Sequence, residues 1–156
     1  MNVPAVFRYG LGGLAALMVL VMTAVTAVDV TGRYVLGTPL TGAFEITELS
    51  LAALVFLGLP LATQTDEHIR VDLLDSIMPD ALRRMSTLVV DWMSALVLAV
   101  LAWQLWRKTA SLLEDAQVTN TLEIPLAPIG MLMSASCALS AVVLAVKGVL
   151  ALRSTP

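Results

Sequence analysis

The stretch LGGLAALMVLVMTAVTAV, residues 11–28, contains no charged side chain and decides how the rest of the chain is interpreted. A helix needs about 20 apolar residues to cross a bilayer core of about 30 Å. Three further long apolar stretches follow, at residues 46–63, 85–106 and 129–152, each with one charged residue. Backbone groups inside a bilayer must be hydrogen-bonded within the protein, which favours helices, and no stretch alternates like a strand. The sequence therefore predicts an all-α membrane protein with four transmembrane helices.

The composition agrees with this interpretation. Of the residues, 58% are hydrophobic and 13% are charged, whereas a soluble domain carries roughly a quarter charged residues. We treat residues 1–156 as one four-span membrane domain, and we expect the first span to remain as an anchor and not as a cleaved signal peptide. The single cysteine, Cys137, excludes an intramolecular disulfide framework, and no basic run suggests binding to nucleic acid.

Basic residues beside the spans predict the orientation, because positively charged segments stay in the cytoplasm. With the N-terminus inside, three basic residues lie outside, and the six inside are Arg8, Arg70, Arg83, Arg84, Lys147 and Arg153. The outer three are Arg33, Arg107 and Lys108. We therefore expect both termini in the cytoplasm. Trp103 and Trp106 would then lie at the outer edge of the third span, where aromatic residues gather.

The segment between the second and third spans is the most charged part of the chain. Within residues 69–78, apolar side chains recur at helical spacing and the polar ones fall largely on the other side. This pattern predicts a short amphipathic helix that lies in the membrane interface. Pro79 should end it, and Asp80 should cap the third span. His68 is the sole histidine, and it is either a solvated loop residue or a contact with a partner.

Two charged side chains fall inside the predicted spans at a similar depth. Asp91 lies in the third span and Lys147 lies near the end of the fourth. Acids inside a membrane usually face the bundle interior and form pairs. We treat Asp91 and Lys147 as a candidate intramembrane charge pair. The alternative is that both side chains extend to the inner headgroups.

Glu45 and Glu48 are three residues apart at the start of the second span, so they share one helix face. An acid there is favoured by the helix dipole, and Arg33 at the same membrane edge is a possible ion-pair partner for either. The other interpretation is a polar contact with another membrane subunit. Small residues mark close helix packing in membranes, and we expect this packing to be within the chain. They are Gly10, Gly13, Ala16, Ala24 and Ala27 in the first span, and Ser134, Ser136 and Ser140 in the fourth.

Several motifs, in this order, resemble the small membrane subunit (DctQ type) of tripartite ATP-independent periplasmic (TRAP) transporters. The resemblance covers nearly the whole chain, and its most specific part is EHIRVDLL at residues 67–74. The other motifs are DVTGRYV at 29–35, PL at 39–40 with FEITEL at 44–49, LVFLG at 54–58, and LEIP at 122–125.

The resemblance implies a non-catalytic subunit of a sodium-coupled importer of organic-acid-type solutes in the bacterial inner membrane. A large membrane subunit would carry the sodium and substrate sites, so this chain needs no cofactor. A soluble periplasmic protein would deliver the solute, and the small subunit would brace the large one and help dock the binding protein. The contact candidates at the ends of the spans are Arg33, Glu45, Glu48, His68, Arg70 and Asp72.

A different function class stays open from the residues alone. A small proton-coupled exporter that works as a homodimer needs an essential acid in the membrane, and Asp91 or Glu48 would have to be that acid. The lone histidine argues against a haem anchor. The transported solute cannot be identified from these residues.

Overall fold

The computed structural model describes residues 5–64 and 80–153, which form four long helices. They are α1 (Ala5–Thr31), α2 (Ala43–Gln64), α3 (Asp80–Glu114) and α4 (Ala127–Arg153), and a π-helical turn, η1 (Gly32–Leu36), extends α1. All four are long enough and apolar enough to cross a membrane. The described residues contain no strand, only one isolated bridge between Val118 and Pro125. The predicted all-α fold with four transmembrane helices is therefore confirmed.

Each predicted span lies inside one of these helices, and each helix continues beyond it. The 35 residues of α3 correspond to a length of roughly 50 Å, well above the thickness of a bilayer core. Pro128 is the second residue of α4, in the first turn where proline is tolerated. The predicted interfacial helix at 69–78 lies outside the described residues, so it stays a prediction.

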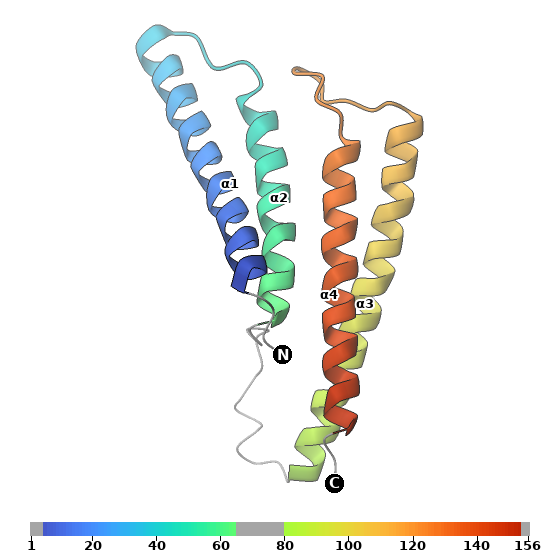
Figure 1. Ribbon diagram of the computed structural model, residues 1–156. Helices are drawn as coiled ribbons and strands as arrows, with labels where there is room; N and C mark the ends of the chain where they lie inside the picture. The colour runs from blue at the N-terminus through green and yellow to red at the C-terminus, as the bar shows by residue number, and fades with distance from the viewer. Residues whose placement is uncertain (1–4, 65–79, 154–156) are drawn as a thin grey trace.

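The helices form two antiparallel hairpins that lie side by side (Figure 1). Each hairpin packs its own two helices together, and α2 packs against α4 to join the hairpins. The described helices are therefore arranged in a row, in the order α1, α2, α4, α3. The α1–α2 and α3–α4 connections lie at one end of the row, which we call the loop end. The first and last helices begin and finish at the opposite, terminal end.

Burial follows this arrangement, because the inner helices of the row have neighbours on two sides. Leu57 of α2 and Cys137, Ser140 and Leu144 of α4 are almost completely buried. In contrast, none of the most apolar window of α1 is buried within the chain. The seam between α2 and α4 is thus the core of the described structure.

Small residues allow close packing in one hairpin but not as expected in the other. The three serines of α4 are buried, as predicted: Ser134, Ser136 and Ser140. Gly130 and Gly148 of α4 lie directly against Thr109 and Trp92 of α3. In α1, however, a Cβ atom added at Gly10 or Gly13 would have no neighbour within 4 Å. The expectation of packing within the chain was wrong for these two glycines, because they lie on a face of α1 that α2 does not cover.

Candidate functional site

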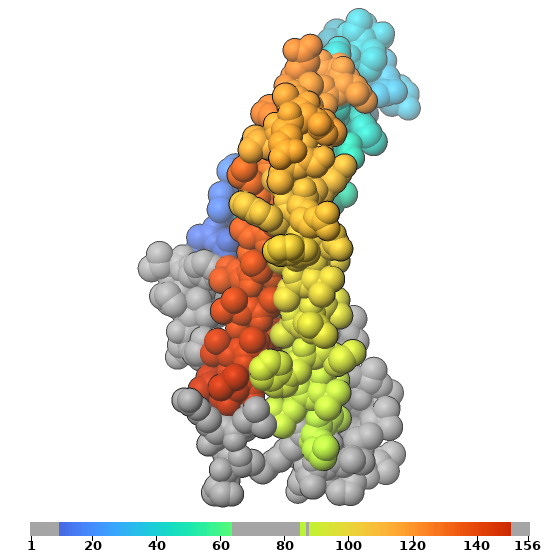
Figure 2. All heavy atoms as spheres, turned by 90° about the vertical axis from the view of Figure 1, so that its right-hand side faces the viewer, coloured from blue at the N-terminus to red at the C-terminus, as the bar shows by residue number. Residues whose placement is uncertain are grey.

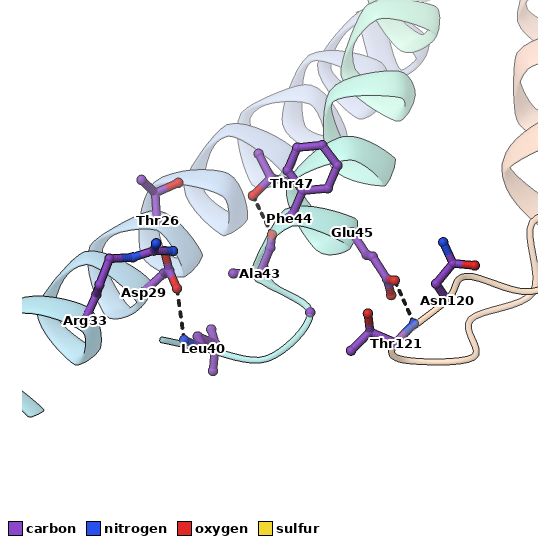
Figure 3. A pocket seen from close by; sticks show the side chains of 11 residues that line it. Thr26, Asp29, Arg33, Leu40, Ala43, Phe44, Glu45, Thr47, Asn120 and Thr121 are labelled. Carbon is purple, nitrogen blue, oxygen red and sulfur yellow. Dashed lines mark hydrogen bonds and ion pairs between the residues drawn. The ribbon is translucent and has the colours of Figure 1, made fainter. Parts of the chain in front are cut away.

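Glu45 joins the two hairpins at the loop end. It lies in the first turn of α2, and its Oε1 atom accepts a 2.7 Å hydrogen bond from the backbone N–H of Thr121. Its Oε2 atom accepts a 3.0 Å bond from the N–H of Leu122. Figure 3 shows the carboxylate pointing at the α3–α4 loop. Hydrogen bonds to an ionised acceptor are stronger than neutral ones, so this carboxylate is a firm link across the row.

The α3–α4 loop is folded so that these two N–H groups are available. The N–H of Thr119 donates to the carbonyl oxygen of Ile124 at 2.9 Å, and that of Leu126 donates to Gln117 at 3.1 Å. Glu123 has a positive φ of 53°, which turns the chain at the tip. The loop is therefore a narrow hairpin whose tip residues have no backbone acceptor within the loop, and Glu45 supplies one.

Gly42 makes the approach between the two loops possible. Its φ is +80°, and a Cβ atom at this position would collide with the side chain of Leu122. Its carbonyl oxygen accepts the N–H of Ile46 at 3.1 Å, which is the first helical hydrogen bond of α2. Glycine is thus required at residue 42, where α2 begins, because the backbone has a positive φ and because Leu122 leaves no room for a Cβ atom.

Asp29 organises the other connection. One carboxylate oxygen forms a 3.0 Å ion pair with Arg33, and the other accepts the N–H of Leu40 at 2.9 Å. The chain leaves α1 through the π-helical turn and reverses at Gly37, whose φ is +67°. Asp29 therefore holds the end of the α1–α2 loop against the helix that precedes it.

A cleft of about 520 Å³ lies between these two carboxylates at the loop end. Figure 3 shows how Asp29, Arg33 and Glu45 approach it from different elements. Phe44, which lines the cleft, is 79% exposed, and Tyr34, which follows Arg33 in the chain, is 83% exposed. The Arg33 side chain is 58% exposed, so part of its guanidinium group faces solvent. We call this region the loop-end cleft, lined by Thr26, Asp29, Arg33, Leu40, Gly42, Ala43, Phe44, Glu45, Thr47, Asn120 and Thr121.

The predicted contact residues separate into three groups. Arg33 and Glu45 both line the loop-end cleft, but Arg33 pairs with Asp29 and not with either glutamate. Glu48 is exposed and forms no ion pair with any described residue. His68, Arg70 and Asp72 lie outside the described residues, so their roles stay predictions.

At the terminal end, Lys147 closes the same seam. Its ammonium group donates a 2.8 Å hydrogen bond to the backbone carbonyl oxygen of Thr63, in the last turn of α2. Carbonyl groups there have no partner within their helix, and the helix dipole favours a cation. Asp91 is buried, with 9% exposure. Trp92 lies against Gly148, so Asp91 and Lys147 lie at the same level of the α3–α4 hairpin, and their direct pairing stays a prediction.

The arrangement holds helices together; among the described residues it gathers no group of three or more potential metal ligands. Sequence reasoning missed Asp29, Leu40, Gly42, Thr121 and Leu122. The i,i+4 spacing of Asp29 and Arg33 was a usable signal. The Glu45 contact had none, because its donors are backbone groups 76 and 77 residues away.

Comparisons with known proteins identify the family of this chain. Residues 22–154 match the family model of the DctQ component of tripartite ATP-independent periplasmic transporters. A relative is the ectoine TRAP transporter small permease protein TeaB of Halomonas elongata, 26% identical over 125 residues. That match covers 76% of this chain and 65% of TeaB, so the chain spans less than two thirds of this relative. Because the family match runs from within α1 to the end of α4, the chain belongs to the DctQ family, whose members are non-catalytic transporter subunits and not enzymes.

Proposed function

We propose that this chain is the small permease subunit of a sodium-coupled tripartite importer in the bacterial inner membrane. Both termini lie in the cytoplasm, and the loop end faces the periplasm. The sodium and substrate sites belong to a large membrane subunit, and a periplasmic protein delivers the solute. The chain braces the large subunit and helps to dock the binding protein. Organic-acid-type solutes are the proposed cargo. The relative TeaB belongs to a transporter named for ectoine, so ectoine is the first solute to test.

The row of four helices is the observation that carries this proposal. In a row, every helix has two faces that its neighbours do not cover, and these faces are apolar here. Leu20 of α1, Val55 of α2 and Leu96 of α3 are 66%, 58% and 62% exposed. A row of this kind is suited to forming a wall. Lipid would cover part of its apolar surface, and a larger membrane protein would cover the rest.

The two polar links make that wall rigid. Glu45 connects α2 to the α3–α4 loop at one end of the seam, and Lys147 connects α4 to α2 at the other. The seam between the hairpins is therefore fixed at both ends, which resists sliding of one hairpin against the other. Resistance to sliding is the property that a brace for a moving subunit requires.

Two features supply contact surfaces for partners. Gly10 and Gly13 of α1 have open space at their Cβ positions, and small residues allow another helix to approach closely in a membrane. At the loop end, Tyr34 and Phe44 are largely exposed beside Arg33. Exposed aromatic and arginine side chains are enriched at the centres of protein interfaces. We assign the first feature to the large subunit and the second to the binding protein.

Uptake in reconstituted vesicles tests this function. The chain, the large membrane subunit and the binding protein would be supplied together and singly, with radiolabelled ectoine and a defined sodium gradient. We expect uptake when all three proteins and the gradient are present, and loss of uptake when this chain is left out. Equal uptake without the chain would contradict the proposal. Transport by the chain alone, driven by a proton gradient, would support the exporter instead.

A further inference from the structure

A groove runs along the outward surface between α3 and α4, separate from the loop-end cleft. It has a volume of about 670 Å³, within the range of roughly 300–1,000 Å³ that is usual for pockets that enclose a small molecule. Ala99, Trp103 and Trp106 line it from α3, and Ala135, Ala138 and Val142 line it from α4. Figure 2 shows α3 and α4 side by side.

The groove opens to the outside and not to the seam between the hairpins. Ala135 and Ala138 are exposed, and Trp103, Trp106 and Val142 are 64%, 57% and 59% exposed. The groove exists because the alanine side chains are short. The indole rings of Trp103 and Trp106 form its wall at one end. An apolar groove that opens outward from a transmembrane hairpin is in contact with lipid chains.

One basic side chain lies at the loop end of the groove. Arg107 follows Trp103 by one helical turn, so it continues the same side of α3. Lys108, in contrast, is two and a half helical turns after Ala99, so it falls on the opposite side of the helix. Arg107 is exposed and forms no ion pair within residues 5–64 and 80–153. Tryptophan marks the level of the membrane–water boundary, so the Arg107 guanidinium group lies at the level of lipid headgroups, above the apolar groove.

We propose that this groove binds an anionic glycerophospholipid of the leaflet at the loop end. Its phosphate contacts Arg107, which reaches the headgroup level on a long apolar stem. One acyl chain passes Trp106 and Trp103 and lies against Ala138 and the residues below. From residue 106 to residue 99 the groove runs roughly 10 Å along the helix, which suits the upper part of a chain. This assignment does not depend on the proposed function.

Charge complementarity decides between a lipid and other occupants. A helix of another protein would need an acid at its end to match Arg107, whereas every anionic phospholipid carries its charge at this depth. The apolar part accepts any acyl chain, so the selectivity is for the headgroup. A lipid held here would fill the hollow between the helices and stabilise the α3–α4 hairpin.

Native mass spectrometry of the full chain, purified with any subunit that accompanies it, tests the site. Phosphatidylglycerol and phosphatidylcholine with identical acyl chains would be added in equal amounts. We expect retained phosphatidylglycerol to exceed phosphatidylcholine by about fivefold, as one basic side chain near the headgroup implies. Arg107→Gln should reduce phosphatidylglycerol to the level of phosphatidylcholine. Ala138→Leu, which fills the groove, should reduce retention of both lipids.

Two matched variants serve as controls. Arg33→Gln removes a charge at the same end of the molecule but on the other hairpin, and Ala24→Leu adds bulk at an exposed position of α1. Both should leave lipid retention unchanged. Equal retention of the two lipids by the unaltered chain, or equal effects of Arg107→Gln and Arg33→Gln, would overturn the proposal. It would also fall if Ala138→Leu released an accompanying membrane subunit without changing lipid retention.

Discussion

The ammonium group of Lys147 lies 2.8 Å from the backbone carbonyl oxygen of Thr63 and donates a hydrogen bond to it. The two residues are 84 positions apart in the chain, and they belong to different hairpins. Thr63 is fully buried, with an exposed fraction of 0%. The Lys147 side chain thus supplies a hydrogen-bond donor, from across the seam, to a backbone carbonyl group at the end of α2.

Replacing Lys147 with methionine should loosen this seam. The variant keeps the apolar stem but loses the charged donor, so the buried Thr63 carbonyl group loses this hydrogen bond. We expect a loss of about 1–2 kcal/mol in the free energy of unfolding, measured by denaturant titration in detergent micelles. Lys108→Met, at an exposed position, is the matched control. Equal stability of the two variants would contradict the assigned role.

Glu45 and Glu48 form a natural pair for comparison, because they share a helix but differ in their contacts. Glu45→Gln keeps one good acceptor and removes the charge, so the N–H groups of Thr121 and Leu122 should be bound more weakly. Hydrogen exchange at these two amides should rise towards that of freely exposed amides. Glu48→Gln should leave the exchange of both amides unchanged. Protection that survives in Glu45→Gln would mean that the loop holds its own shape.

Gly42→Ala should disturb the same contact from the opposite side. The new side chain would force a positive φ on alanine, which costs roughly 1–2 kcal/mol, and it would collide with Leu122. We expect a lower melting temperature and faster exchange at the loop tip. Gly58→Ala is the control, because a Cβ atom there meets no neighbour within 4 Å and alanine is a better helix former. A neutral Gly42→Ala would contradict the close approach described here.

The candidate charge pair needs a double-mutant cycle. Asp91→Asn, Lys147→Met and the combined variant would be compared by denaturant titration. If the side chains interact, the double variant should lose less stability than the sum of the single variants, by about 0.5–3 kcal/mol. Additive losses would show that each residue is held by other groups.

Transport measurements on two acid variants test the exporter. Transport that survives both Asp91→Asn and Glu48→Gln would exclude this function, because it requires an acid in the membrane.

The helices could be predicted because apolar length is a strong signal, and the ends of α2 and α4 lie within a few residues of the predicted spans. The end of α3 could not: the third span was predicted to end at Trp106, whereas α3 continues to Glu114. An apolar stretch reports only the part of a helix inside the bilayer core, and most residues after Trp106, such as Arg107 and Lys108, favour a helix outside it. The lengths of the helices beyond the membrane therefore depend on local propensity, which hydropathy does not report.

At the candidate site, only residues that contribute functional side chains could be predicted. Glu45 and Arg33 were both selected for their position at the end of a span, and both line the loop-end cleft. Their partners were not predicted. Thr121 and Leu122 contribute backbone N–H groups, which every residue except proline has, so no residue type marks them. The row order of the helices was not predicted either, since it depends on which apolar faces pack together, and all four helices are apolar on most sides.

Affinity purification of the tagged full chain tests the central claim most directly. The chain would be extracted in mild detergent from cells that also express the genes that flank its own gene. The account predicts that a large membrane subunit co-purifies in a fixed ratio. Gly10→Leu with Gly13→Leu, on the open face of α1, should reduce that recovery, while Val19→Phe, which adds bulk at an exposed position on a different side of the same helix, should leave it intact. Recovery of the chain alone, or as a homodimer with transport activity of its own, would contradict the account.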